Sequence, residues 1–70
     1  MTKNYDVLAS TAQLVYQYLV DTIGKHNYQR VPYQEIADEI DRTRSGVSYA
    51  VRVLVKKGKA KIKDGKIAVF

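Results

Sequence analysis

Two groups of polar and basic side chains in the second half of the chain have types and spacings that suit a nucleic acid. The first group follows a predicted turn and the outward face of a predicted helix, and comprises Arg42, Thr43, Arg44, Ser45, Ser48, Tyr49 and Arg52. The second group lies on a predicted hairpin and comprises Lys59, Lys61, Lys63 and Lys66. Arginine can donate two hydrogen bonds to guanine, serine is permissive, and a tyrosine ring packs on a thymine methyl group. Lysines neutralise phosphates. These residues are therefore the expected DNA contacts.

Each group also has a simpler interpretation. Arg44 and Arg52 could belong to an ordinary solvated helix face, and Tyr49 could cover the hairpin. Lysines on an exposed strand discourage pairing between sheets of different molecules. The distribution of charge favours the DNA interpretation. Residues 1–41 carry a net charge of −3, whereas residues 42–70 carry nine basic groups, a single acidic group and a net charge of +8. Attraction for a polyanion is thus concentrated in the last 29 residues.

Groups that could support catalysis are missing from the sequence. The single histidine, His26, lies in a polar stretch and is expected at the surface. Glu35, Asp38 and Glu39 fit the wet face of a helix better than a catalytic site. No nucleophile and base pair, phosphate-binding loop or metal-ligand cluster is present. We therefore predict a protein that is not an enzyme, with no catalytic residue, no metal site and no cofactor.

The length and composition indicate one small domain, residues 1–70. Seventy residues bury limited surface, and the absence of cysteine excludes disulfides. No apolar run is long enough to cross a bilayer, and the N-terminus lacks the apolar core of a signal peptide. We therefore expect a cytoplasmic, nucleoid-associated protein with no membrane partner.

The first third of the chain predicts an arm followed by a helix. Residues 1–9 are expected to form an N-terminal arm and residues 10–25 the helix, which opens with the capping box Ser10-Thr11-Ala12-Gln13. Its buried stripe is expected at Ala12, Val15, Leu19 and Ile23, with Tyr16 and Val20 beside it. Leu14 and Tyr18 lie off this stripe. They either widen the core face or form a dimer contact.

Two further helices are separated by a tight turn. Residues 30 and 31 are extended before proline and could add a short strand near Arg30-Val31. Residues 32–40 predict a helix that buries Ile36, Ala37 and Ile40. Asp41 tolerates the left-handed conformation that the turn needs. Thr43 is a suitable N-cap for a helix over residues 44–57, whose apolar stripe is expected at Val47, Val51, Leu54 and Val55.

The last element is a two-stranded hairpin over residues 59–70, which forms the wing. Asp64-Gly65 is a strong signal for a type I′ turn. With this turn, Lys63 pairs with Lys66, Ile62 opposes Ile67, and Ala60 opposes Val69. The apolar members of these pairs would face the core, and the four lysines would face outward. Phe70 is expected to fold over one end of the core.

From Ile36 to Ala60 the chain resembles the winged helix-turn-helix of bacterial transcription regulators, such as the MarR-like and GntR-like repressors. The N-terminal domain of the SOS repressor is similar in layout. The resemblance rests on Ile36-Ala37-Asp38-Glu39-Ile40, a four-residue turn, an apolar and basic helix from Arg44, and Lys57-Gly58 before the wing. It implies an α+β fold with residues 44–57 as the recognition helix in the major groove. The wing would then lie on the phosphate backbone or in the minor groove. Two residues depart from the pattern: Asp41 replaces a usual glycine, and Arg42 a usual aliphatic residue.

The sequence thus predicts a small bacterial or phage regulator of transcription, a repressor in the pattern of its relatives, that binds specific double-stranded DNA. It would act as a homodimer through the first helix and the N-terminal arm, or as one module of a larger assembly. The alternatives are an architectural or recombination-directionality factor of a mobile element, a protein-interaction winged helix, and an RNA-binding winged helix.

Overall fold

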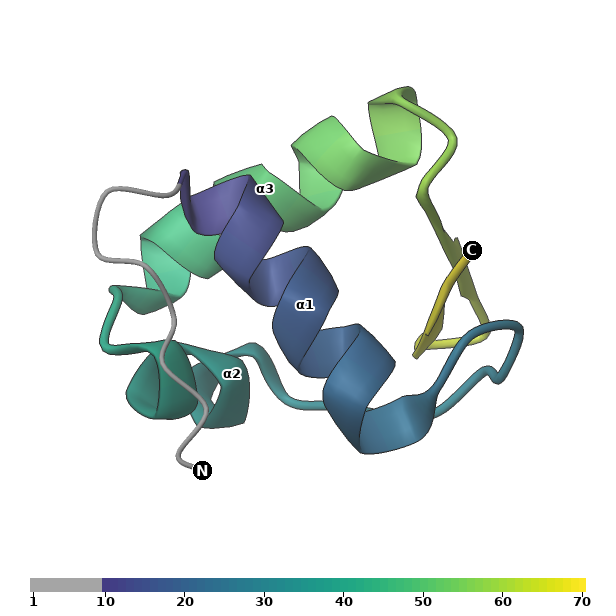
Figure 1. Ribbon diagram of the computed structural model, residues 1–70, viewed down its shortest axis with the longest axis horizontal. Coiled ribbons are helices and arrows are strands. Elements are labelled where there is room, and N and C mark those ends of the chain that lie inside the picture. The colour runs from purple at the N-terminus through teal and green to yellow at the C-terminus, as the bar shows by residue number, and fades with distance from the viewer. Residues whose placement is uncertain (1–9) are drawn as a thin grey trace.

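The computed structural model describes residues 10–70 and has three helices followed by a β-hairpin (Figure 1). The helices are α1 (Thr11–Ile23), α2 (Tyr33–Ile40) and α3 (Arg44–Lys56), and the strands are β1 (Ala60–Lys63) and β2 (Lys66–Val69). This order confirms the predicted α+β layout of a winged helix. The predicted N-terminal arm, residues 1–9, lies outside the described residues. Within residues 10–70, no helix has both the length and the apolar character needed to cross a membrane.

The start and end of α1 follow from local hydrogen bonds. The predicted capping box is present: the Ser10 hydroxyl accepts from the Gln13 N–H, and the Gln13 side chain accepts from the Ser10 N–H. The helix ends at Ile23, two residues before the predicted end at residue 25. Gly24 leaves the helical conformation with φ 74°, and the side chain of Asn27 donates to the freed Ile23 carbonyl at 2.9 Å.

The turn between α2 and α3 also has the predicted chemistry. Asp41 adopts the left-handed conformation, with φ 58° and ψ 50°, and so closes α2. The hydroxyl of Thr43 accepts a 3.1 Å hydrogen bond from the Gly46 N–H and caps α3. Helix α2 begins at Tyr33, with Pro32 as its N-cap residue. These local contacts fix how the two helices of the helix-turn-helix follow one another.

Helix α3 ends in a Schellman motif. The N–H of Gly58 donates to Val55 O at 3.0 Å, and the N–H of Lys59 donates to Leu54 O at 2.9 Å. Gly58 has φ 76°, which a side chain would disfavour. The last helical residue is Lys56, one residue before the predicted end. This compact ending leads the chain directly into β1.

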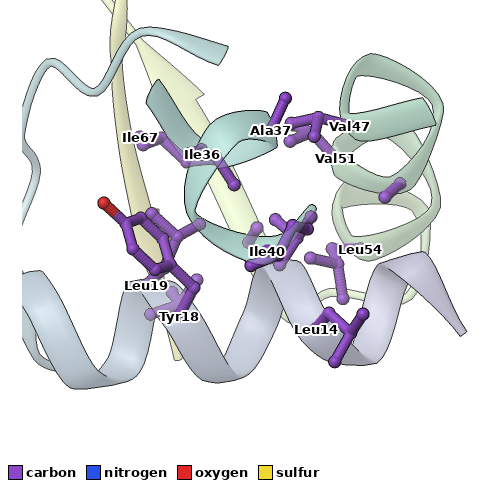
Figure 2. Packing of buried hydrophobic residues seen from close by; sticks show 14 residues of the cluster. Leu14, Tyr18, Leu19, Ile36, Ala37, Ile40, Val47, Val51, Leu54 and Ile67 are labelled. Carbon is purple, nitrogen blue, oxygen red and sulfur yellow. The ribbon is translucent and has the colours of Figure 1, made fainter. Parts of the chain in front are cut away.

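The core lies between the three helices and the inner face of the hairpin (Figure 2). Its members from α1 are Leu14, Val15, Tyr18 and Leu19, which confirms the interpretation that Leu14 and Tyr18 widen the core face. Ala12, Tyr16, Val20 and Ile23 are only partly buried. The prediction that Val55 belongs to the stripe of α3 was wrong, since its side chain is 40% exposed. Helix α3 instead buries Val47, Ala50, Val51 and Leu54.

The hairpin has the predicted register, but its apolar face is shorter than expected. Ala60 pairs with Val69, Ile62 with Ile67, and Lys63 with Lys66. Asp64 and Gly65 have φ 54° and 75°, as a type I′ turn requires. Ile67 is buried, yet its partner Ile62 is 51% exposed. Ile62 shares the face of its cross-strand partner Ile67, but the expectation that the core covers it was wrong.

A third segment lies beside β2 without forming a regular strand. Gln29 exchanges two backbone hydrogen bonds with Ile67, at 2.9 and 2.8 Å, and the N–H of His26 donates to Val69 O at 2.8 Å. In place of the strand expected near Arg30-Val31, the segment forms two isolated bridges to β2, one between Gln29 and Ile67 and one between Lys25 and Val69. His26 has a φ of 66°, and this sharp bend keeps the segment from extending into a longer ladder.

Candidate nucleic-acid interface

The outward face of α3 carries the predicted recognition residues. Arg44, Ser45 and Arg52 are exposed, and Ser48 is half-buried. Arg44, Ser48 and Arg52 are spaced by four residues, so they form one stripe along the helix. The opposite stripe is fully used in the core. The helix therefore presents its polar side to solvent because its apolar side holds it against α1 and α2.

Tyr49 is the most exposed large hydrophobic side chain among the described residues, with 66% of its surface accessible. It follows Ser48 on the outward side of α3, and no ring–ring or cation–π contact involves it within residues 10–70. Leaving an aromatic ring in water forgoes the gain from burying it. Its position beside two arginines suits contact with a partner.

Arg42 and Thr43 both form hydrogen bonds in or next to the turn between α2 and α3. The Thr43 hydroxyl caps α3, as described above, and also lies 3.4 Å from Ser45 Oγ. Arg42 is half-buried, and its Nη1 donates to the carbonyl of Asp41 at 3.3 Å. Thr43 therefore stabilises the start of α3, and Arg42 contacts the residue that ends α2.

The four lysines of the hairpin divide into two pairs. Lys63 and Lys66 lie opposite each other next to the turn and are exposed. Lys59 and Lys61 rest on aromatic rings: Lys59 Nζ is 5.5 Å from the centroid of Tyr16, and Lys61 Nζ is 5.4 Å from that of Phe70. Such cation–π contacts orient an ammonium group without neutralising its charge. The tip of the hairpin is the more freely available cationic end.

Arg30 is a further cation at the hairpin that sequence reasoning missed. Its guanidinium group lies over Gly65, since a Cβ placed on Gly65 would be 3.0 Å from Arg30 Nη1. The side chain is exposed and adds a third positive charge next to Lys63 and Lys66. The only available signal was that Gln29 and Arg30 precede a proline, which indicates an extended chain but does not say where it leads.

The site as a whole joins two positive surfaces on one small body. Helix α3 provides arginines and hydroxyl groups at regular spacing, and the hairpin provides exposed ammonium groups at its tip. Comparison of the chain with known protein families, with characterised proteins and with solved structures finds no match. The side chains and their arrangement are thus the basis for assigning a function.

Proposed function

We propose that this chain is a winged helix-turn-helix domain that binds specific double-stranded DNA as a small regulator of transcription. The observation that carries the proposal is the division of α3 into two sides. One side is buried in the core, and the other presents Arg44, Ser48, Tyr49 and Arg52 to solvent. A helix held in this way by its apolar side can enter a major groove with its polar side.

The chemistry of the outward residues fits base recognition. Arg44 lies in the first turn of α3 and Arg52 two turns later, so they can reach separate base pairs along the groove. Each guanidinium group can bond the O6 and N7 atoms of a guanine. Tyr49 can pack on a thymine methyl group or donate to a phosphate. Gly46 leaves room for the cap of α3, since a Cβ at this position would lie 3.1 Å from Thr43 Oγ1.

The wing would contact the backbone. Lys63, Lys66 and Arg30 form a positive cluster around the type I′ turn, where long side chains can follow a phosphate strand. Contacts of this kind set the position of a protein on the duplex but do not read its sequence. Specificity is thus assigned to α3 and general affinity to the wing.

Specific binding favours two copies of the domain, because one small domain covers few base pairs. The dimer contact considered for Leu14 and Tyr18 is not available, since both are buried in the core. The exposed residues of α1 are polar, among them Gln13, Gln17 and Asp21. A dimer through α1 would have to use these polar groups together with the N-terminal arm, and it stays a prediction.

The first experiment is selection of bound sequences from a pool of random duplexes at low and moderate salt, followed by sequencing. We expect an enriched motif, with a two-fold repeat if two copies bind. The Arg44→Ala/Arg52→Ala double variant should lose the motif. Lys25→Ala, which removes an exposed charge outside α3, is the matched control and should retain it. Salt-sensitive binding without any motif would instead indicate an architectural role.

Salt dependence gives a second, quantitative check. If about five or six cations contact phosphates, the logarithm of affinity should fall with the logarithm of salt concentration at a slope near −5. An acidic protein partner or structured RNA of equal length should compete poorly against the selected duplex. Failure to bind any duplex at low salt would contradict the proposal and favour a protein-interaction domain.

A further inference from the structure

The outer face of the sheet, which points away from the core, carries a group of aromatic and basic side chains. Successive residues of a strand point to opposite faces. Ile67 and Val69 belong to the core, so Lys66, Ala68 and Phe70 point outward. The same alternation, applied to the bridge between Gln29 and Ile67, places Tyr28 and Arg30 on the outer face as well.

Three aromatic rings from distant parts of the chain meet on this face. The ring of Phe70 contacts that of His26 at a centroid distance of 5.1 Å and that of Tyr28 at 6.3 Å. The planes cross at 70° and 67°, so neither His26 nor Tyr28 is stacked face to face on Phe70. His26 is exposed and Tyr28 is 38% exposed. The rings are therefore fixed in position yet open to solvent.

Ala68 shows that this cluster is packed rather than loose. It is fully buried, although it pairs with Lys61 on the outer face and does not belong to the main core cluster. Its neighbours on this face, from the register, are Lys61, Tyr28 and Phe70. Side chains on the outer face must cover it, which makes a small apolar floor beneath the rings.

Positive charge surrounds the rings. Lys61 holds its ammonium group over Phe70, Arg30 lies at the turn, and Lys63 and Lys66 continue along the same face. Asp64 is the sole carboxylate of the hairpin, at the tip of the turn. Rings that are open to solvent among cations are the arrangement on which proteins bind unpaired bases while neutralising their phosphates.

We propose that this outer sheet face, formed by His26, Tyr28 and Phe70 with Arg30 and the wing lysines, binds single-stranded DNA by base stacking. A base can lie on the Tyr28 ring only when it is unpaired, because a duplex offers this face its phosphates and groove edges. The choice of DNA over RNA rests on the proposed function, since a strand opened beside a duplex site would be DNA. The stacking itself is independent of that function.

The test is fluorescence of the Tyr28→Trp variant, because the chain has no other tryptophan. A twelve-nucleotide oligothymidine should quench this tryptophan on binding, whereas an abasic strand of the same length should not. In fluorescence anisotropy with a labelled oligothymidine, Tyr28→Ala should weaken binding about fivefold or more, and Tyr28→Phe should bind like the unmodified chain. Gln34→Ala, which truncates an exposed side chain of α2 away from both proposed DNA sites, is the control and should leave this affinity unchanged.

The duplex and single-strand sites can be separated by their variants. Arg44→Ala/Arg52→Ala, introduced into the Tyr28→Trp chain, should weaken duplex binding and preserve quenching by oligothymidine. Tyr28→Ala should weaken binding of oligothymidine and preserve duplex binding. Equal quenching by the abasic strand, or unchanged affinity in Tyr28→Ala, would reduce the face to a phosphate contact and overturn the proposal. Tighter binding of oligouridine RNA would overturn the choice of DNA. If Tyr28→Ala does not fold, the comparison of quenching by oligothymidine and by the abasic strand still tests the proposal.

Discussion

The hydroxyl group of Tyr16 donates a 2.7 Å hydrogen bond to the backbone carbonyl of Phe70, which joins α1 to the residue that follows β2. The N–H of Phe70 donates to Lys59 O at 2.9 Å, so the two ends of the hairpin are held together at the same place. Lys59 in turn rests on the Tyr16 ring. One tyrosine therefore anchors the base of the wing to the helical core.

Replacing Tyr16 with phenylalanine should remove this anchor while keeping the ring. We expect the free energy of unfolding to fall by about 1 kcal/mol, the usual contribution of a single hydrogen bond. Chemical denaturation followed by circular dichroism would measure it. Tyr33→Phe is the control, because Tyr33 is half-buried at the start of α2, and its loss of a hydroxyl should change stability by less than about 0.5 kcal/mol. Equal effects in the two variants would contradict the anchoring role.

Ile62 and Ile67 face each other across the hairpin and should respond very differently to truncation. Ile67 is 3% exposed and Ile62 is 51% exposed. Ile67→Ala should cost about 2–5 kcal/mol, because it leaves a cavity in the core. Ile62→Ala should cost less than about 1 kcal/mol, which is the range of strand propensity alone. Thermal unfolding of both variants would measure these losses of stability. A large loss of stability in Ile62→Ala would contradict the exposed position of Ile62 and would mean that its side chain packs on another surface.

Asp41 combines a left-handed backbone with a negative charge at the C-terminal end of α2. Both features are unfavourable, since glycine accepts this conformation more easily and the helix dipole disfavours an anion there. We expect Asp41→Gly to raise the free energy of unfolding by about 0.5–1 kcal/mol. Asparagine also tolerates the left-handed conformation, so Asp41→Asn should give only the part of this gain in stability that comes from removing the negative charge. Destabilisation by both changes would mean that the carboxylate has a favourable partner.

Tyr49 should matter for duplex binding and hardly at all for folding. Because its ring is 66% exposed, Tyr49→Ala should change stability by less than about 0.5 kcal/mol. Affinity for the selected duplex should fall by about 1–2 kcal/mol if the ring contacts a base. Tyr49→Phe distinguishes the two roles considered, because it keeps packing on thymine but loses a bond to phosphate. Undiminished affinity in Tyr49→Ala would remove this residue from the interface.

Features that depend on neighbouring residues could be predicted from the sequence. Ser10 and Gln13 form the expected capping box, Thr43 caps α3, and Asp64-Gly65 sets the register of the hairpin. Each of these is a hydrogen bond or backbone conformation within a few positions of the residue that causes it. The outward position of Arg44 and Arg52 follows similarly, from the period of the helix and the apolar residues between them.

Features that depend on distant contacts were decided by the tertiary structure. Leu14 and Tyr18 are buried in the core, whereas Val55 and Ile62 are exposed although the helix period and the strand register assigned them to apolar faces. Arg30 lies on Gly65, and Phe70 meets His26, across tens of residues of chain. The periodicity of apolar residues predicts that a helix or strand has an apolar side and roughly which residues form it. Only the packing of several elements at once determines how far that side extends and which side chains gather beyond it.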